Sequence, residues 1–271
     1  MEFSVLIPVC NKEKTEYLKE AIKSIIFQTE KPNQIVIVKD GQLPKELNEI
    51  IERYKKQYPK IIDILELSKQ NSLGKVLNEG IKKCKNSYIA RMDSDDIAKK
   101  DRFEKQISYL RKHPNVDVLG GYIEEYEENM KKATSLRKVP LEQEEIYKKI
   151  VKQSPFNHST VMFKKKSVLE VGGYKDCLLE DYDLWVRMRL QNMKMANLSD
   201  VLVNYRTSLN MYKRRTGLKY LKGVIEIEKF LIKHKLINKF QYLNNIAVRT
   251  ILAFIPAKIK MFLYPNVIRK V

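Results

Sequence analysis

Cysteine is scarce in this chain of 271 residues, and its three cysteines, Cys10, Cys84 and Cys177, lie far apart. An odd number of cysteines without a Cys-X-X-Cys pair indicates neither a disulfide framework nor a zinc site. Cysteine usage of this kind is typical of a reducing compartment, so we expect a protein of the cytoplasm.

The chain also lacks a long uncharged apolar run. Residues 246–264 come nearest to one, but Arg249, Pro256, Lys258 and Lys260 interrupt it, and a membrane-spanning helix needs about 20 apolar residues. The apolar stretch at residues 3–9 is too short for a signal peptide and instead predicts a first strand. Neither a transmembrane helix nor a secretion signal is therefore expected.

Acidic residues are outnumbered, because 33 Asp and Glu stand against 52 Lys and Arg, a formal net charge of +19. The excess is uneven: residues 206–271 hold 15 Lys and Arg but only Glu226 and Glu228, a net charge of +13. Basic surfaces attract nucleic acid, anionic lipid or phosphorylated substrates, and the charge alone does not choose among them.

What the chain does contain is a regular alternation of strand-like and helical periods, on a composition of 44% hydrophobic and 31% charged residues that is ordinary for a globular protein. Strands are predicted at residues 4–9, 34–39, 61–67 and 88–92, and helices at 17–27, 43–54 and 73–84. Such alternation predicts parallel strands joined by crossover helices. Ligands bind beyond the carboxyl ends of such strands, so residues 9–11, 39–41 and 93–96 are expected at one common edge.

The pattern changes after residue 100. Further elements are predicted as a helix at 101–112, a strand at 116–123, a charged hairpin tip at 124–132, a strand at 159–163, a turn at Gly172-Gly173-Tyr174, a helix at 180–190, a strand at 201–205, and long helices at 213–235 and 238–264. The last helix is basic and amphipathic. We expect it to lie in a membrane interface, with packing against the rest of the chain as the alternative.

Three carboxylates, Asp93, Asp95 and Asp96, follow directly on the apolar run at 88–92. Carboxylates this close repel one another, and a hard divalent cation with oxygen ligands, shared with a phosphate group, removes the repulsion. A solvated acidic turn is the alternative for an Asp-X-Asp motif read alone. A calcium-binding EF-hand loop fits less well, because Ala98 occupies the position that requires glycine.

Five motifs occur together along the chain: residues 4–11 (SVLIPVCN), 36–41 (VIVKDG), 71–80 (NSLGKVLNEG), 89–96 (IARMDSDD), and Gly172-Gly173-Tyr174 followed by 180–185 (EDYDLW). Each motif is weak alone, but in this order they resemble glycosyltransferase family 2, and in particular the bacterial enzymes that build capsule and other surface polysaccharides. The resemblance implies the GT-A fold, an α/β fold with a Rossmann-like mixed sheet flanked by helices, here with a C-terminal helical appendage.

The resemblance also implies where a nucleotide-diphosphate sugar, UDP-linked, binds. The base and ribose are assigned to Pro8, Val9, Asn11, Glu13 and Asp40, and the wall beside the sugar to Asn71, Gly74, Lys75, Asn78 and Gly80. A carboxylate such as Asp40 can accept a hydrogen bond from the uracil imide, although capping of the turn at Gly41 is the alternative. Ser94 joins the donor site, and Arg102 and Arg206 are candidate partners of the diphosphate. A surface position on a helix is the alternative for Arg102.

For the chemistry, the resemblance assigns Mn²⁺ or Mg²⁺ to Asp93, Asp95 and Asp96, without deciding which of Asp95 and Asp96 is the main ligand. Asp181 is the implied base that takes the proton of an acceptor hydroxyl, and one displacement at the anomeric carbon implies inversion. An acid in the first turn of a helix is also favoured by the helix dipole alone. Acceptor contacts are assigned to Glu180, Asp183, Trp185 and His158, of which Trp185 can also be a core residue and His158 an ordinary loop residue.

The sequence thus predicts a metal-dependent inverting glycosyltransferase of the hexosyltransferase type that acts on a glycan or lipid-linked acceptor at the inner face of the cell membrane. We expect a catalytic domain at 1–206, with a nucleotide-binding part at 1–100 and an acceptor-binding part at 101–206, and a basic tail at 207–271 that binds an anionic membrane surface. The oligomeric state is left open.

Two other classes are less consistent with the chain. A nucleotidyltransferase needs a Gly-rich, basic triphosphate loop after the first strand, and residues 8–12 (PVCNK) are not one. A nucleic-acid-binding protein is suggested by the sequence pI of about 9.6. It would place its basic residues on the sheet surface, whereas the expected sheet edge is acidic, so no nucleic-acid partner is expected.

Overall fold

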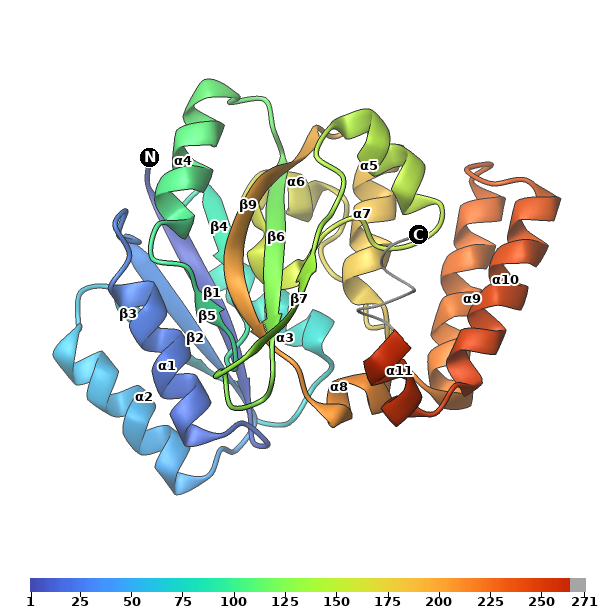
Figure 1. Ribbon diagram of the computed structural model, residues 1–271. Helices are drawn as coiled ribbons and strands as arrows, with labels where there is room; N and C mark the ends of the chain where they lie inside the picture. The colour runs from blue at the N-terminus through green and yellow to red at the C-terminus, as the bar shows by residue number, and fades with distance from the viewer. Residues whose placement is uncertain (264–271) are drawn as a thin grey trace.

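The computed structural model describes residues 1–263 and shows one curled mixed sheet with helices on both faces (Figure 1). The strands are β1 (Phe3–Cys10), β2 (Gln34–Asp40), β3 (Ile62–Glu66), β4 (Tyr88–Arg91), β5 (Ile97–Ala98), β6 (Val118–Tyr126), β7 (Ala133–Arg137), β8 (Met162–Lys164) and β9 (Met195–Arg206). Their order in the sheet is β3-β2-β1-β4-β8-β6-β9-β5, and β7 pairs with β6 outside this path.

The first half of the sheet is parallel, as the alternation predicts. β1 pairs in parallel with β2 and β4, and β2 with β3, so their carboxyl ends meet at one edge. Cys10 at the end of β1 lies opposite Asp40 at the end of β2. Beyond β4 the sheet becomes mixed: β8 runs antiparallel to β4 and β6, while β6 and β9 are parallel. The expectation of a shared edge is confirmed.

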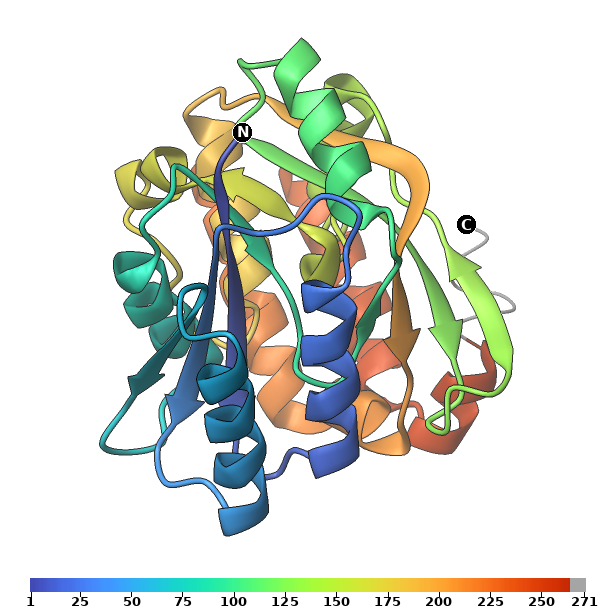
Figure 2. The same cartoon turned by 90° about the vertical axis from the view of Figure 1, so that its left-hand side faces the viewer.

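Helices cover both faces of the sheet, and Figure 2 shows α1 and α2 standing in front of β1 and β2. The bounds are α1 (Thr15–Ile26), α2 (Lys45–Gln57), α3 (Leu73–Lys83), α4 (Arg102–Lys112), α5 (Gln143–Ile150), α6 (Lys165–Glu170), α7 (Glu180–Leu190), α8 (Leu209–Arg214), α9 (Gly217–Lys233), α10 (Lys239–Phe254) and α11 (Ala257–Leu263), with a 3₁₀ turn at His158–Thr160.

Strand alternation divides the apolar interior into two clusters. Val5 and Ile7 of β1 pack on one face with α1, α2 and α4, whereas Leu6 of β1 packs on the other face with α3, α5 and α7. Burial of both faces explains why β1 and β2 are near-continuous apolar runs, as is usual for parallel strands covered by helices. Ile227 and Leu231 of α9 belong to the second cluster, so this part of the tail shares the core.

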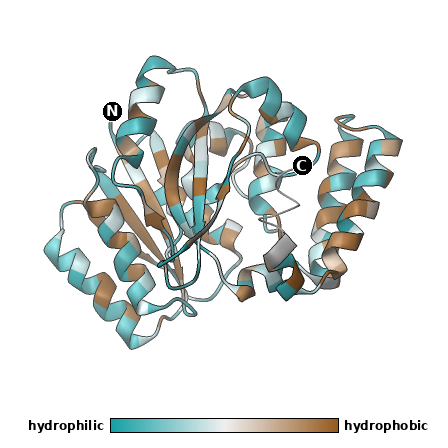
Figure 3. Cartoon of the chain, viewed as in Figure 1, coloured by the Kyte–Doolittle hydropathy of each residue, from teal (hydrophilic) through white to brown (hydrophobic). Residues whose placement is uncertain are grey.

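The structure differs from the predicted elements mainly after residue 125. Strand β7 and helices α5 and α6 were not predicted, and the expected helix at 238–264 is two helices, α10 and α11, because Pro256 lacks the backbone N–H that a continuous helix needs. No helix within residues 1–263 has the length and apolar character needed to cross a bilayer. The end of the expected helix at Tyr264 lies outside the described residues. Figure 3 shows apolar residues along α9 and α10, at the side of the molecule away from α1 and α2.

Candidate active site

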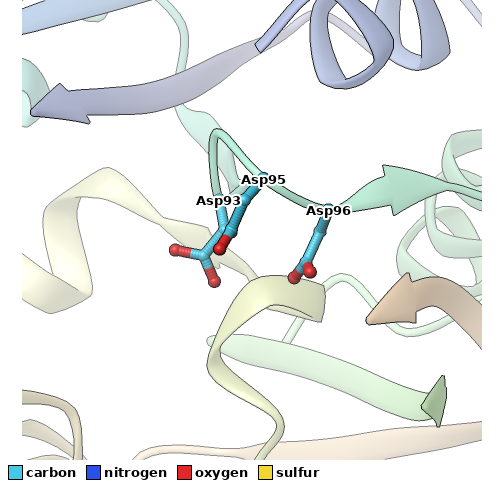
Figure 4. A group of neighbouring side chains, drawn as sticks. All are labelled: Asp93, Asp95 and Asp96. Atoms are coloured by element: carbon cyan, nitrogen blue, oxygen red, sulfur yellow. The ribbon is translucent and has the colours of Figure 1, made fainter. Parts of the chain in front are cut away.

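The loop between β4 and β5 gathers three carboxylates (Figure 4). One oxygen from each of Asp93, Asp95 and Asp96 lies within 4.8 Å of the others. The loop forms because β4 ends at Arg91, opposite Leu6 in the middle of β1, and β5 then crosses to pair with β9. Among residues 1–263, these three are the acidic side chains that lie close enough to one another to bind a single metal ion.

Burial makes this cluster electrostatically costly. Burial and the negative charges of Asp93 and Glu13 raise the pKa of Asp95 to about 7. Asp96 is fully buried, and its burial, together with the charges of Asp95 and Asp93, raises its pKa well above the usual range. One Asp96 oxygen has no hydrogen-bond partner among residues 1–263. Three close carboxylates with an unpartnered buried oxygen fit a divalent cation with oxygen ligands.

Two arginines support the strand end beneath this loop. Arg91 is buried, and its guanidinium donates to the carboxylate of Asp93. Arg102 was assigned to the diphosphate, but it is fully buried under the loop. Its guanidinium donates to the Arg91 carbonyl at 2.8 Å and to the side chain of Gln106 at 3.1 Å. The structure therefore places Arg102 in a supporting position and not at the open edge.

Arg206, at the end of β9, holds the acidic loop from the other side. Its backbone N–H donates to Asp96 Oδ1 and its Nε to the Asp95 carbonyl, both at 2.8 Å. The same guanidinium pairs with Glu20 at 2.7 Å and lies over the Tyr17 ring at 3.7 Å. Its donors are thus engaged with the protein, although Arg206 was assigned to the diphosphate.

The first loop, after β1, lies beside the acidic loop. Val9 is buried, Pro8 is half-buried and Asn11 is exposed, so of these three only Asn11 is freely open to a ligand. The Ser94 hydroxyl donates to the carboxylate of Glu13. This bond joins the segment assigned to the nucleotide to the segment assigned to the metal.

Asp40, at the carboxyl end of β2, is half-buried and accepts a hydrogen bond from the backbone N–H of Asn71 at 2.8 Å. Gly41 follows with φ of +73°, and a Cβ there would stand 2.8 Å from the Gln70 nitrogen. The turn therefore needs glycine. Asp40 thus ties the end of β2 to the segment before α3.

Helix α3 holds the Gly-Gly-Tyr turn. Asn78 donates to the carbonyl of Tyr174 at 2.7 Å and accepts from its N–H at 2.8 Å. Gly74 allows the closest approach, because a Cβ there would lie 2.3 Å from the Lys175 carbonyl oxygen. Gly80 similarly lies against Leu6 of β1. Lys75 pairs with Asp176 at 2.6 Å across the same junction. These motif residues join α3 to the segment that leads into α7.

The first turn of α7 carries the acids assigned to the acceptor. The Asp181 carboxylate accepts from the Ser154 hydroxyl at 3.1 Å. Burial and the charge of Asp181 raise the pKa of Glu180 to about 8, and Glu180 also feels the charges of Arg91 and Asp93. Glu180 thus lies close enough to the acidic loop for the charge of Asp93 to act on it. Asp183 is buried and paired with Arg187 at 2.6 Å and Lys175 at 3.3 Å.

Two other assigned residues lie behind this turn. His158 Nε2 lies 2.9 Å from the Tyr174 hydroxyl, and burial, with the nearby charge of Arg91, lowers the pKa of His158 well below its usual value. The side chain is therefore a neutral hydrogen-bonding group. Trp185 is fully buried against Phe156, with ring centroids 5.0 Å apart. It is a core residue in this structure, the alternative that the sequence left open.

Sequence reasoning missed Ser154 and Tyr174, the polar partners of Asp181 and His158. Tyr174 belongs to the Gly-Gly-Tyr motif, and this membership is the sequence signal that could have identified it. Ser154 lies in the segment after α5, a helix that was not predicted, and its contact with Asp181 spans 27 positions.

The fold and the site together define a class. A curled mixed sheet, the carboxyl ends of its first parallel strands at one edge, and an Asp-X-Asp loop after β4 are those of a GT-A glycosyltransferase. Residues 4–173 match the family described as "Glycosyl transferase family 2". The chain belongs to this family.

Relatives cover the full length. The chain is 36% identical over 263 residues to the amylovoran biosynthesis glycosyltransferase AmsE of Erwinia amylovora, covering 97% of each. It is 34% identical over 270 residues to the UDP-Gal:alpha-D-GlcNAc-diphosphoundecaprenol beta-1,3-galactosyltransferase of Escherichia coli, covering 99% of this chain and 97% of that one. An uncharacterized glycosyltransferase of Haemophilus influenzae is 35% identical over 270 residues, covering 100% of both.

Solved structures agree on the fold. S. aureus TarS 1-349 in complex with UDP-GlcNAc has a TM-score of 0.62 at 18% identity, covering 93% of this chain and 82% of that one. The mannosyltransferase PcManGT from Pyrobaculum calidifontis, in complex with GDP-Man and Mn²⁺, has a TM-score of 0.64 at 12% identity, covering 93% and 69%. Both carry the GT-A architecture. The GT-A expectation is confirmed.

Proposed function

We propose that this glycosyltransferase moves a sugar from a UDP-linked donor to a hydroxyl of a glycan or lipid-linked acceptor, with inversion at the anomeric carbon, in bacterial surface polysaccharide synthesis. The relatives of similar length support this proposal, because their names include an amylovoran enzyme and a galactosyltransferase whose substrate is a diphosphoundecaprenol-linked sugar.

The donor half of the proposal rests on the edge formed by β1, β2 and β4. Asp40 and Asn11 would bind the base and ribose, and the Ser94–Glu13 bond joins the first loop to the acidic loop. Asp93, Asp95 and Asp96 would hold Mn²⁺ or Mg²⁺, which would supply positive charge opposite the leaving diphosphate. Arg91 orients Asp93 for this role.

The acceptor half rests on Asp181. Inverting transfer needs one base that takes the acceptor proton as the hydroxyl attacks the anomeric carbon. The Ser154 hydroxyl leaves the second Asp181 oxygen for that proton. Glu180, whose pKa of about 8 keeps it protonated at neutral pH, can donate a hydrogen bond to an acceptor oxygen.

The single observation that carries the proposal is the convergence of the three carboxylates within 4.8 Å, close enough to Glu180 for the charge of Asp93 to act on it. The experiment is a screen of UDP- and GDP-sugars for nucleoside diphosphate release with Mn²⁺. Release from a UDP-sugar that stops on chelation supports the proposal. Release that continues in excess EDTA contradicts the requirement for a divalent cation. Release from GDP-sugars alone contradicts the assignment of a UDP-linked donor.

We also propose that the enzyme works on an anionic membrane surface through α10. Several large apolar side chains of this helix are exposed, among them Phe240, Leu243, Ile251 and Phe254 at 57% to 79%. Residues 229–271 contain no acidic residue. Basic charge beside an exposed apolar helix face suits a lipid surface of opposite charge. From the sequence we expect Leu252, Ile255, Phe262 and Leu263 to enter the lipid as well. Leu252 and Ile255 are only half-exposed, and the side chains of Phe262 and Leu263 are not among those described.

Vesicle binding tests this partner. Full-length protein should bind vesicles that contain phosphatidylglycerol and not vesicles of phosphatidylcholine alone. Exchange of both Ile251 and Phe254 to Ser should weaken binding at least about tenfold, because each buried apolar side chain contributes roughly 1.5–3 kcal/mol. Asn244→Ser on the same exposed stretch is the control. Equal binding by the double variant and this control would show that the apolar face of α10 does not bind the vesicles.

A further inference from the structure

The turn at residues 150–154, which follows α5, lies directly against the acceptor side of the site. Two of its groups are held by α7: the Tyr182 hydroxyl donates to the Ile150 carbonyl at 2.6 Å, and the Ser154 hydroxyl donates to Asp181 at 3.1 Å. Asp181 and Tyr182 are neighbours in the first turn of α7. The position of this turn and the position of the candidate base are therefore linked.

The same turn is held from its other side by α10. Asn245 donates to the carbonyl of Val151 at 3.0 Å, and the Arg249 guanidinium donates to the carbonyl of Lys152. Contacts from α7 and α10 thus fall on adjacent residues of one short segment. A shift of α10 that keeps these bonds therefore moves the backbone of Val151 and Lys152, two to three residues before Ser154.

A buried carboxylate on α9 holds the two α10 side chains that donate hydrogen bonds to the turn. Glu228 is fully buried, and burial raises its pKa. Its oxygens lie 3.0 Å from the Asn245 amide and 3.5 Å from Arg249 Nε. Loss of either partner leaves a buried carboxylate less well paired, which is costly. Asn245 and Arg249 are thus held inward, whereas Phe240, Ile251 and Phe254 are exposed; Tyr242 packs against the second apolar cluster.

Apolar packing alone does not explain where α10 lies. Of the residues of α10, all within the described chain, only Ala253 is buried. The helix is attached by its contacts with α9 and by the polar grip on the 150–154 turn. A helix held in this way can transmit a change at its outer face to that turn.

We infer that Asn245 and Arg249 are positioning residues for Asp181, acting through the 150–154 turn and Ser154. The inference rests on the proposed role of Asp181 as the base, and it adds that two residues of α10 help to orient this base. Binding of the outer face of α10 to a lipid surface then acts on the same turn, so that docking and the orientation of the base are coupled.

Amide hydrogen exchange of the full-length protein, without any donor, is the first test. Asn245→Ala should raise exchange about threefold to tenfold in peptides that cover 151–156 and the start of α7, in keeping with the loss of one hydrogen bond. Asn244→Ala, an exposed neighbour of the same residue type, should leave these peptides unchanged. Equal exchange in the two variants would overturn the inference, whether or not the protein transfers a sugar. Arg249→Lys should lie between wild type and Arg249→Ala.

Steady-state kinetics with the nucleotide sugar found in the screen is the second test. Asn245→Ala should lower kcat about threefold to tenfold and leave the donor KM unchanged, because the effect reaches Asp181 and not the donor edge. Combined with Ser154→Ala, it should add little, since both changes act on one contact. Multiplying effects in the double variant, or a change confined to KM, would show that α10 has a merely structural role.

Discussion

The acidic edge of the sheet and helix α10 differ in which side chains they bury. At the edge, charged side chains such as Asp96 and Arg91 are buried and held by neighbouring elements. On α10, apolar side chains such as Phe240 and Ile251 are exposed, while Asn245 and Arg249 turn inward. Each arrangement costs free energy in the isolated chain. In the proposed function a bound partner would offset each cost: a cation and a diphosphate at the edge, and a lipid surface at α10.

The largest effect is expected from Asp95→Ala, which removes one side of the carboxylate cluster. Nearly all activity should be lost while the fold is kept, because the change creates no cavity in the apolar core. The measurement is nucleoside diphosphate release with Mn²⁺, beside far-UV circular dichroism. Asp200→Ala, which removes a carboxylate paired with Lys105 on the surface, is the control and should be nearly as active as wild type. Substantial turnover by the Asp95 variant would contradict the requirement of the carboxylate cluster for catalysis.

Asp181→Asn should lower transfer by about 10² to 10⁴, the usual range for loss of a general base. Binding of the nucleoside diphosphate, measured by calorimetry with Mn²⁺, should stay close to wild type because the proposed role of Asp181 is toward the acceptor. Transfer at more than about a tenth of the normal rate would exclude Asp181 as the base.

Gly74→Ala should destabilise the edge by about 1–3 kcal/mol, the usual cost of overpacking. The new Cβ would stand 2.3 Å from the Lys175 carbonyl oxygen and push α3 away from the Gly-Gly-Tyr turn. Chemical denaturation measures the loss. Gly217→Ala is unsuited as a control because φ there is +78°, so Lys83→Ala, an exposed residue at the far end of α3, serves instead. Equal stability of the two variants would show that α3 can move freely.

The buried acids should make the metal-free protein less stable as the pH rises. Asp95 and Glu180 have pKa values raised to about 7 and about 8, so the folded state binds protons that the unfolded state has lost. Their contribution is present at acidic pH and disappears as the pH passes through these values. The free energy of unfolding should fall on the order of 1 kcal/mol between about pH 6.5 and pH 8.5. Glu180→Gln should flatten this fall; an unchanged slope would contradict the assignment.

The smallest effect is expected on α10. Ile251→Ser and Phe254→Ser should change the free energy of unfolding by no more than about 0.5 kcal/mol, as is usual for exposed positions. Thermal unfolding of full-length protein measures this. A much larger loss would mean that the apolar face of α10 packs within the molecule, and the contrast with the edge would disappear.

Much of the edge could be predicted because its signals are local. The acids of the β4–β5 loop are consecutive, Asp40 precedes a glycine with positive φ, and α7 has the predicted bounds of residues 180–190. Helix α5 was missed because it is short, with Ile146 and Ile150 as its buried residues among charged ones. Strand β7 has no buried residue to create an alternation.

Side-chain direction was the part that sequence could not supply. Arg102 begins a predicted surface helix, yet Arg91 and Gln106 draw its guanidinium inward. Arg206 is engaged by Glu20 and Tyr17 of α1, far away in the chain. The link from α10 through the 150–154 turn to Asp181 joins three separated segments, and no spacing rule predicts such contacts.

The central claim is that the acidic edge binds a nucleotide sugar through a divalent cation. The most direct measurement is binding of UDP to the full-length protein by calorimetry, with Mn²⁺ and with excess EDTA, for wild type and Asp95→Ala. The account predicts that UDP binds wild type only when Mn²⁺ is present and that the variant loses this dependence together with the affinity. Equal UDP affinity in Mn²⁺ and in EDTA, or wild-type affinity in the variant, would contradict it.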